Sequence, residues 1–510
     1  MRCPVGVRAL FPGADRGIWW TLLTFFQILI EVPMLPFESF SYPFFDLSTS
    51  ADHRALVAAH LSTPDVAIEG DHTRGLKALY VHIPFCDTLC TFCPFVKWVG
   101  TPDRIAAFLA ALHVELETLG ATPRMQGWEI DSVYIGGGTP SVLNVEQIAA
   151  LMGAIRAHFT LAADVEISFE FEVKSVSPEK FDALAELGVT RVSFGVQSFD
   201  PAIRDMVHIT ASPDQVYNAI GWAGQRFANT NLDMMTGFPG QDTAHARRDA
   251  RLAAESGVAS VSMYPVDYVM TLPGWQERIR SGELPRPAML DDRSRMFHEA
   301  RAALLESMGE QNMYCFGDST APATRYMFST LYGGYRDEAV GVGPGAYSFI
   351  RGLAWMNDAD ERHYAKTAGA GLLPITRSSV YHAYEKGLVF FPKRLTFDMR
   401  DLAVLDLDKV YAERIERIVD AGHAELAGDI LRLTEPGKLV YSELMAHFFA
   451  DPQQRLYHRI VDRLSQQVGV IDETEWKAGA DRVAAMGATN ALPGASSRTR
   501  HKRLPLVTAR

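Results

Sequence analysis

The chain has 510 residues, 47% hydrophobic and 22% charged, a composition typical of a globular protein with a large core. Its formal net charge of −12, from 49 basic and 61 acidic residues, argues against nucleic acid as the main partner. Its five cysteines make a secreted disulfide framework improbable, so clustered cysteines here indicate metal or redox chemistry.

An uncharged run of 14 residues, "GIWWTLLTFFQILI" (17–30), stands near the N-terminus. It is too short for a transmembrane helix, and no small-residue cleavage pattern of a signal peptide follows it. We interpret it as a packed or peripheral N-terminal segment of a cytoplasmic protein. Contact with a membrane surface and a translation start at Met34 are the alternatives.

Strand-like and helix-like stretches alternate between residues 75 and 265. Strands are predicted at 78–83, 132–137, 165–172, 190–196, 230–240 and 258–266. Helices are predicted at 103–119, near 145–159, and near 178–187, 212–226 and 243–256. Asn144 and Gln147 form a potential capping pair for the second helix. Six such repeats predict a parallel sheet curled into a full or partial barrel, with sites at the carboxyl ends of the strands.

Residues 267–390 show a weaker pattern, with a helix near 289–308 and a short strand entering the glycine-rich turn of "EAVGVGPGAYSF" (338–349). A compact helical unit with a small strand hairpin is predicted at 395–448, and the basic tail 494–510 is predicted to be disordered. We divide the chain into an N-terminal extension (1–74), a barrel core (75–270), a barrel-completing and substrate-side segment (271–392), a small α+β C-terminal domain (393–450), and a terminal helix with the basic tail (451–510).

The stretch "YVHIPFCDTLCTFCPF" (80–95) places Cys86, Cys90 and Cys93 in a C-x3-C-x2-C array directly after the first strand. Three thiolates on one loop complete a tetrahedral zinc site only with a fourth ligand from elsewhere. They can hold three irons of a cubane cluster and leave the fourth iron open to a ligand or substrate. Three buried free cysteines and a zinc site completed by a distant residue are the alternatives.

This array, with an aromatic residue before its last cysteine, resembles the radical S-adenosylmethionine (radical SAM) superfamily. The segments "YVHIPFC", "YIGGGTPS", "RVSFGVQSF", "DMMTGFPGQ" and "VGVGPGAYSF" resemble, in order, the HemN-like family of oxygen-independent coproporphyrinogen III oxidase, and "LRLTEPG" resembles its small C-terminal domain. The resemblance implies a partial (β/α)6 TIM-like barrel. It also implies one [4Fe–4S] cluster on the three cysteines, SAM at the open iron, and a flavodoxin- or ferredoxin-type electron donor. In that family, reductive cleavage of SAM yields a 5′-deoxyadenosyl radical that takes hydrogen from a small-molecule substrate.

The resemblance also assigns SAM-binding residues at the strand ends. Gly137, Gly138 and Thr139 match the turn that meets the methionine end of SAM, where glycines let backbone N–H groups approach a carboxylate. Glu170 matches a carboxylate that reaches the ribose hydroxyls. The other matching positions are Tyr80 near the methionine moiety, Phe92 at the adenine side, and Gln197 and Asp233 in the SAM pocket.

The chain departs from the oxidase at two places and from the haem-carrying members of the family at a third. Pro94 and Phe95 stand where the oxidase has a glycine and a fourth cysteine, and Ile209 aligns with its SAM-binding arginine. The segment 321–334 has no histidine, whereas haem-carrying members have a histidine–asparagine pair there. We therefore expect methyl or methylene transfer to a planar, unsaturated small molecule, as in the class C methyltransferase branch that binds two SAM molecules. Porphyrinogen oxidation and a haem chaperone-like carrier are the alternatives. The positions that match the second SAM pocket are Asp267 and Tyr347.

Overall fold

A computed structural model shows how the chain is arranged. It describes residues 53–65, 74–93, 95–266, 273–288, 290–317, 324–329, 333–380, 383–404 and 407–448. The apolar run 17–30, Asp267 and the basic tail lie outside the described residues, so the expectations about them stay predictions. Within the described ranges, no helix combines the length and the apolar character needed to cross a membrane.

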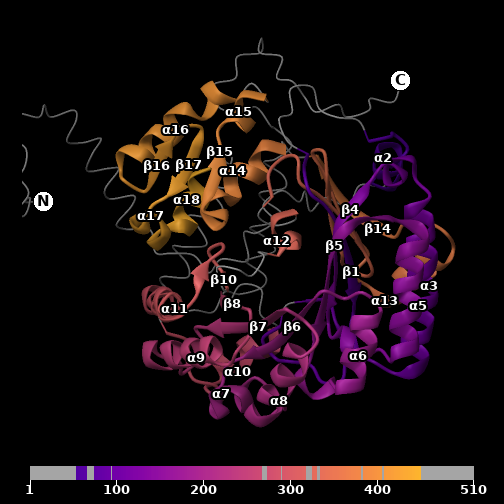
Figure 1. The fold of residues 1–510 in the computed structure, drawn as a ribbon, viewed down its shortest axis with the longest axis horizontal. Coiled ribbons are helices and arrows are strands. Elements are labelled where there is room, and N and C mark those ends of the chain that lie inside the picture. Colours follow the sequence, from indigo (N-terminus) through magenta and orange to yellow (C-terminus); the bar gives the residue numbers. More distant parts are fainter. Residues whose placement is uncertain are drawn as a thin grey trace, which may run out of the picture.

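A 12-stranded sheet curves through the molecule as an arc (Figure 1). Its centre consists of six parallel strands in chain order: β1 (Lys77–Ile83), β4 (Glu129–Gly137), β5 (Thr160–Phe171), β6 (Arg191–Gln197), β7 (Asn229–Thr236) and β8 (Ser260–Pro265). These strands are largely apolar because both faces of a parallel sheet are covered. The two edge strands of the described sheet do not pair with each other, which confirms the predicted partial barrel.

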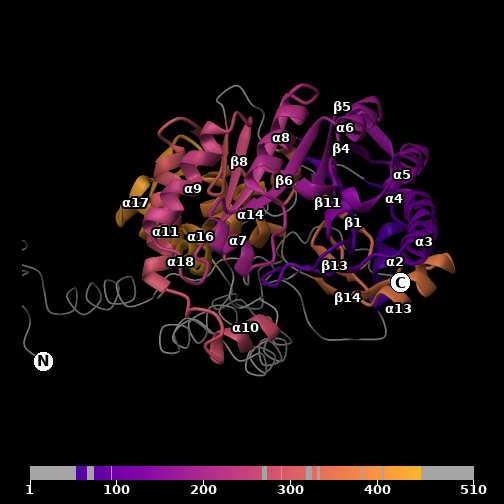
Figure 2. The same cartoon turned by 90° about the horizontal axis from the view of Figure 1, so that it is seen from below.

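Helices cover the outer face of the arc (Figures 1 and 2). They are α3 (Pro102–Gly120), α5 (Val145–His158), α6 (Pro178–Glu186), α7 (Pro201–Met206), α8 (Pro213–Gly224), α9 (Thr243–Glu255) and α11 (Leu290–Leu304). Asn144 caps α5 and Gln147 completes the predicted capping box. The buried side of α3 carries Phe108, Leu112 and Leu116, four residues apart, and this stripe packs against the sheet. The sequence pattern did not predict α7, which is too short to show a period.

The segment after β8, whose sequence pattern was weak, completes both edges of the sheet. On one side, β11 (Glu338–Val342) pairs parallel to β1, and antiparallel strands follow it: β12 (Tyr347–Ile350), β13 (Leu353–Asn357) and β14 (Ile375–Val380). On the other side, β10 (Cys315–Gly317) and β9 (Gly309–Glu310) extend the sheet beyond β8. α12 (Arg325–Ser329) lies inside the arc and contacts β4 and β1 (Figure 1). The other helices of the barrel part are α2 (His53–Leu61), α4 (Pro123–Gln126), α10 (Pro273–Arg280) and α13 (Glu361–Gly369).

A small α+β unit follows and confirms the predicted hairpin. Its sheet has the order β15 (Thr396–Asp398), β17 (Ile430–Leu433) and β16 (Ala424–Ala427). Its helices are α14 (Ala383–Arg394), α15 (Arg400–Val404), α16 (Asp408–Asp420), α17 (Glu435–Leu439) and α18 (Tyr441–His447). A buried contact of 2.9 Å between the hydroxyls of Tyr314 and Tyr441 joins this unit to the barrel. The division of the chain into five domains stays a proposal.

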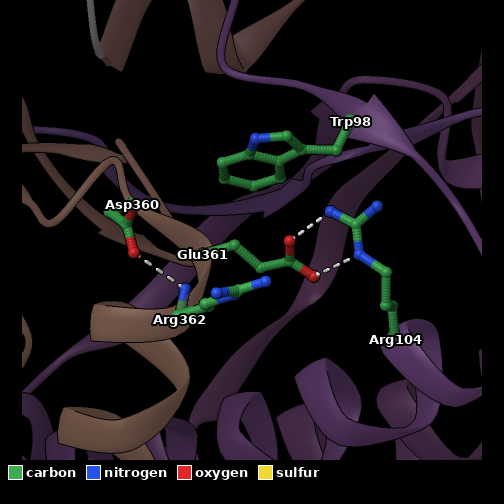
Figure 3. A pocket seen from close by; sticks show the side chains of 5 residues that line it. All are labelled: Trp98, Arg104, Asp360, Glu361 and Arg362. Atoms are coloured by element: carbon green, nitrogen blue, oxygen red, sulfur yellow. Dashed lines mark hydrogen bonds and ion pairs between the residues drawn. The ribbon is translucent and has the colours of Figure 1, made fainter.

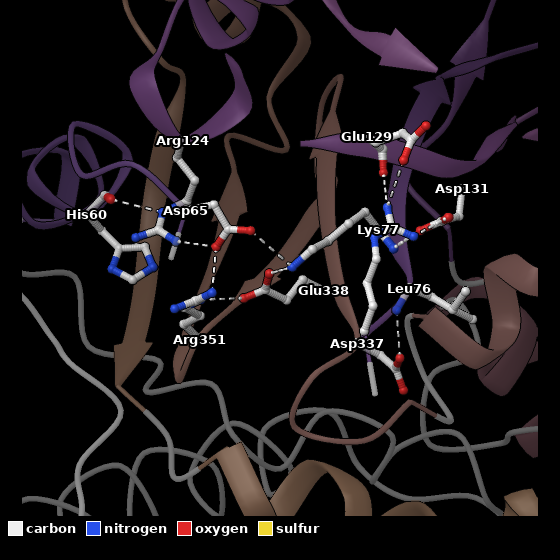
Figure 4. Close-up of polar contacts among 11 residues, drawn as sticks. His60, Asp65, Leu76, Lys77, Arg124, Glu129, Asp131, Asp337, Glu338 and Arg351 are labelled. Atoms are coloured by element: carbon white, nitrogen blue, oxygen red, sulfur yellow. Dashed lines mark hydrogen bonds and ion pairs between the residues drawn. The ribbon is translucent and has the colours of Figure 1, made fainter. Parts of the chain in front are cut away.

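A buried group of charges closes the end of the sheet where β1 and β11 begin (Figure 4). Asp65, shortly after α2, contacts Arg351 at 2.6 Å and Arg124 at 3.4 Å. Its third contact is Lys77 at 3.6 Å, and Lys77 pairs in turn with Glu338. These five side chains are between 2% and 16% exposed. The group therefore ties the chain after α2 to the floor of the barrel, opposite the carboxyl ends of the strands.

Replacing Asp65 with alanine should destabilise the protein, because three buried cations would lose a shared carboxylate. Removal of one partner of a buried ion pair costs about 3–5 kcal/mol, and we expect the low end of this range. Thermal unfolding of the full chain measures the loss. Asp182→Ala is the control, since that carboxylate is 54% exposed and pairs with Arg226 at the surface. Equal unfolding temperatures of the two variants would contradict the role of Asp65.

Candidate active site

The three cysteines lie on one loop that follows the carboxyl end of β1. A short parallel ladder between β2 (Phe85–Cys86) and β3 (Trp98–Val99) closes this loop. Cys86 is buried, Cys90 and Cys93 are half-buried, and all three are free thiols. The ladder therefore holds the cysteines together at the mouth of the barrel, where the sequence predicts them.

The surroundings of the loop disfavour free thiolates. Burial raises the pKa of the Cys86 thiol to about 11 and that of the Cys90 thiol to about 12. The Thr139 hydroxyl, 3.4 Å from Cys86 Sγ, opposes the rise at Cys86, whereas the charge of Cys93 adds to the rise at Cys90. Because a thiol binds a metal as thiolate, metal binding at this loop is coupled to the release of protons.

The glycine turn after β4 packs directly against the start of the cysteine loop. The Gly138 N–H donates to the Ile83 carbonyl at 2.8 Å, and the Thr139 N–H donates to the Phe85 carbonyl at 2.7 Å. A Cβ on Gly138 would lie 2.8 Å from the Phe85 carbonyl oxygen, so this approach requires glycine. The Thr139 hydroxyl also donates to Cys86 Sγ. The predicted SAM turn therefore contacts the cysteine loop through the N–H groups of Gly138 and Thr139, and its role in binding SAM stays a prediction.

Gly137 brings the turn close to His82 of β1, which in turn contacts Tyr80. It adopts a φ of +115°, and a Cβ there would come within 2.7 Å of the His82 imidazole. His82 Nε2 lies 2.8 Å from the Val96 carbonyl, and its Nδ1 lies 2.9 Å from the Tyr80 hydroxyl. Because a carbonyl only accepts, Nε2 carries the proton and the Tyr80 hydroxyl donates to Nδ1. Burial lowers the pKa of His82 to about 4, which keeps the ring neutral in this arrangement.

Glu170, near the carboxyl end of β5, reaches across to β4. Its Oε1 accepts from the Tyr134 hydroxyl at 2.5 Å, and its Oε2 accepts from the Gly137 N–H at 3.1 Å. Burial and, secondly, the charge of Asp233 raise the pKa of Glu170 to about 7. Each carboxylate oxygen can accept a further hydrogen bond, so Glu170 retains the capacity to bind a diol.

Asp233 and Gln197 lie on the next two strands along the sheet. Asp233 on β7 accepts from Ser193 Oγ at 2.6 Å and from Asn231 Nδ2 at 3.1 Å, and burial raises its pKa. Gln197, the last residue of β6, has a φ of +66°. Such strain in a non-glycine residue is typical of functional sites. Gln197 therefore ends the strand beside that of Glu170, and Asp233 lies on the next strand along the sheet.

Two aromatic residues that the sequence analysis did not single out join this group. Tyr134 of β4 and Tyr326 of α12 stack with ring centroids 4.3 Å apart, and Tyr326 also stacks on Tyr80 at 5.7 Å. Glu166 holds the start of α12 by accepting from the Thr324 hydroxyl at 2.9 Å. The period of two along β4 could have indicated that Tyr134 faces the interior. No local signal indicates Tyr326, because its segment has no readable pattern.

Two further predicted residues, Phe92 and Tyr347, lie on other elements. Phe92 packs edge to face on Phe238 at 5.5 Å, within a small apolar cluster that is separate from the main core and that Cys90 and Cys93 pack against. Tyr347 begins β12, two strands along the sheet from β1. Since Asp267 lies outside the described residues, a pocket formed by Asp267 and Tyr347 stays a prediction.

Two surface cavities lie beside this region, and neither is lined by a predicted site residue. One, of about 430 Å³, is bordered by Trp98 of β3, Arg104 of α3 and the residues 360–362 at the start of α13 (Figure 3). Arg104 Nε donates to Glu361 Oε1 at 3.0 Å across it. The other, of about 580 Å³, lies between α7, α10 and the turn after β7. The candidate site is therefore defined by its side-chain contacts, not by these cavities.

Comparison with known proteins identifies the family. The radical SAM superfamily matches residues 80–253. The heme chaperone HemW of Mycobacterium tuberculosis (strain CDC 1551 / Oshkosh) is 31% identical over 380 residues, which cover 71% of this chain and 92% of that protein. The chain belongs to the HemN-like family of radical SAM proteins. The oxygen-independent coproporphyrinogen III oxidase of Paracoccus denitrificans is 29% identical over 321 residues, or 61% of this chain and 70% of that one. Among solved structures, the chain is similar to coproporphyrinogen III oxidase (HemN) from Escherichia coli, with a TM-score of 0.64 and 23% sequence identity. The match covers 79% of this chain and 94% of the oxidase chain, which confirms the fold.

As a HemN-like radical SAM enzyme, the chain uses a [4Fe–4S] cluster and SAM. When bound, the cluster supplies the electron that cleaves SAM to methionine and a 5′-deoxyadenosyl radical. The cysteine loop fits this group, because it offers three thiols and the buried Thr91 hydroxyl has no hydrogen-bond partner among the described residues. Among the described residues, no group of three His, Cys, Asp or Glu side chains is arranged to bind one metal ion. A cluster on this loop needs only its three thiolates and leaves the fourth iron open, whereas one zinc ion would need a fourth ligand from elsewhere.

An apolar environment surrounds the position that the sequence analysis aligned with an arginine of the oxidase. Ile209, at the aligned position, packs against the apolar cluster around Phe92. Arg204 does not replace the arginine, since its guanidinium is buried and donates to the carbonyls of Val196 at 2.9 Å and Ser198 at 2.8 Å. This HemN-like chain therefore has no cation at that position.

Proposed function

We propose that this HemN-like enzyme removes a hydrogen atom from a tetrapyrrole-type substrate. The aromatic wall formed by Tyr80, Tyr134 and Tyr326, close to Glu170 and the cysteine loop, supports this most. Stacked rings favour a planar, unsaturated ligand, and a water-poor barrel protects a radical from side reactions. The names of the two relatives contain heme and coproporphyrinogen III, which are both tetrapyrroles.

In this proposal the site residues have separate roles. The thiolates of the three cysteines hold the cluster, and Glu170 accepts hydrogen bonds from the ribose hydroxyls of SAM. Asp233 adds a second carboxylate that attracts the positive sulfonium group, an interaction strengthened by the low dielectric of the barrel. Phe92 and Gln197 line the pocket, and an electron donor of the flavodoxin or ferredoxin type reduces the cluster.

Methyl or methylene transfer is the second candidate. It is favoured by the apolar position of Ile209, where the oxidase has its SAM-binding arginine. A site without this cation would hold SAM differently from the oxidase. Such a difference is compatible with a second SAM molecule bound near Asp267 and Tyr347. The relatives themselves are named for oxidation and for heme handling, so we place hydrogen abstraction without methyl donation before the methyl transfer expected from the sequence.

Anaerobic turnover of the reconstituted full chain tests the proposal. With coproporphyrinogen III or heme as substrate, we expect 5′-deoxyadenosine and a tetrapyrrole product of altered mass. S-adenosylhomocysteine formed in addition would identify methyl transfer, and its absence would identify oxidation. Cys90→Ala is the control and should give neither product. Stoichiometric heme binding without SAM cleavage would contradict the proposal and favour a carrier.

A further inference from the structure

A second carboxylate stands two residues beyond Glu170, at the point where β5 ends. The Glu172 N–H donates to Ser141 Oγ at 3.1 Å, which ties Glu172 to the residues that follow the glycine turn. Its Oε1 lies 3.1 Å from Lys174 Nζ, and each of these two side chains is 23% exposed. Its Oε2 is buried and has no hydrogen-bond partner among the described residues. A buried carboxylate oxygen without a hydrogen-bond partner destabilises the folded protein, which suggests that Glu172 has a functional role.

Lys174 connects this carboxylate to the cysteine loop. Its Nζ donates to Thr88 Oγ1 at 3.0 Å and to Thr210 Oγ1 at 3.4 Å. Thr88 lies between Cys86 and Cys90, so the ion pair is attached to the part of the loop that carries two of the proposed cluster ligands. The lysine also joins the loop to the connection between α7 and α8.

The ion pair of Glu172 and Lys174 is held against the cysteine loop, since Lys174 Nζ donates to Thr88 Oγ1. A charged carboxylate beside this loop opposes the accumulation of further negative charge on it. Reduction of a cluster bound there would add one more negative charge at the same place.

We propose that Glu172 and Lys174 together set the reduction potential of the cluster. An anion beside the cluster raises the free energy of its reduced form and lowers the potential, while a neighbouring cation does the opposite. Glu172 thus makes the reduced cluster a stronger reductant, and Lys174 limits this effect while it holds the loop. The inference rests on the three cysteines as ligands and is independent of the substrate.

The test is a redox titration of the reconstituted full chain, followed by electron paramagnetic resonance of the reduced cluster. Glu172→Gln should shift the midpoint potential to a more positive value, because it removes a negative charge and keeps the shape. Lys174→Gln should shift it to a more negative value, and the double variant should lie between the two. Glu179→Gln is the matched control, since that carboxylate is exposed in the first turn of α6 and should leave the potential unchanged.

An unchanged potential in Glu172→Gln with a full cluster, or a shift of the opposite sign, would overturn the inference. If Glu172→Gln did not retain its cluster, the test would rest on Lys174→Gln. A midpoint potential in Lys174→Gln that did not become more negative would also overturn the inference. Failure of the ligand assignment is a separate outcome, since Cys→Ala variants would then keep the cluster signal.

Discussion

Replacement of Cys86, Cys90 or Cys93 with alanine, one at a time, should abolish the [4Fe–4S] cluster. Thiolate ligation supplies the binding, and the loop offers three thiols to a cluster whose fourth iron must stay open for SAM. Loss of one ligand exposes a second iron. Iron and sulfide content and the broad visible absorption, measured after anaerobic reconstitution, should fall to background, and SAM cleavage should be lost with them.

Cys315→Ala is the control within the described chain. Cys315 lies on β10, is buried, and its Sγ is 3.7 Å from Ser262 Oγ, so we expect it to be structural. Cys3→Ala, from outside the described residues, should behave in the same way. A full cluster with SAM cleavage in Cys90→Ala would show that the loop has been assigned wrongly.

Glu170→Ala should weaken SAM binding while the iron content stays intact. A carboxylate that accepts hydrogen bonds from a diol contributes roughly 1.5–3 kcal/mol, which corresponds to about a tenfold to hundredfold loss of affinity. The variant also leaves the Tyr134 hydroxyl and the Gly137 N–H without the partner they have now. Anaerobic equilibrium binding of SAM measures the change. Glu146→Ala, an exposed carboxylate on α5, is the control, and an unchanged affinity in Glu170→Ala would mean that this strand end does not face SAM.

The same carboxyl should give SAM binding a pH dependence. Its pKa is raised from the ordinary value of a glutamate to about 7, mainly by burial and secondly by Asp233. Below pH 7 the group is therefore mostly neutral, and it becomes a full acceptor as the pH rises through 7. SAM affinity should increase between pH 6 and pH 8 in the wild-type chain. In Glu170→Gln this increase should be much smaller, and an identical increase in both proteins would assign it to another group.

Much of the fold and part of the candidate site could be predicted because their signals are local. The six parallel strands appear as separate apolar runs, and the cap of α5 needs only Asn144 and Gln147. The spacing of the three cysteines is likewise contained in one short segment, and their chemistry follows from the ligand type. Residues at the ends of parallel strands, such as Glu170 and Asp233, could be placed together because the barrel brings all such ends to one mouth.

Only the tertiary structure decided which partners these residues have. The N–H groups after β4 bind the end of β1, Arg204 binds backbone carbonyls, and Tyr326 arrives among the tyrosines of β1 and β4 from a distant segment. Hydrogen bonds and ring stacking depend on the packing of segments far apart in the chain. The sequence by itself therefore determined the kind of fold and the cysteine chemistry. The packing determined the aromatic wall and the contact of Lys174 with the cysteine loop, because both join segments that are far apart in the chain.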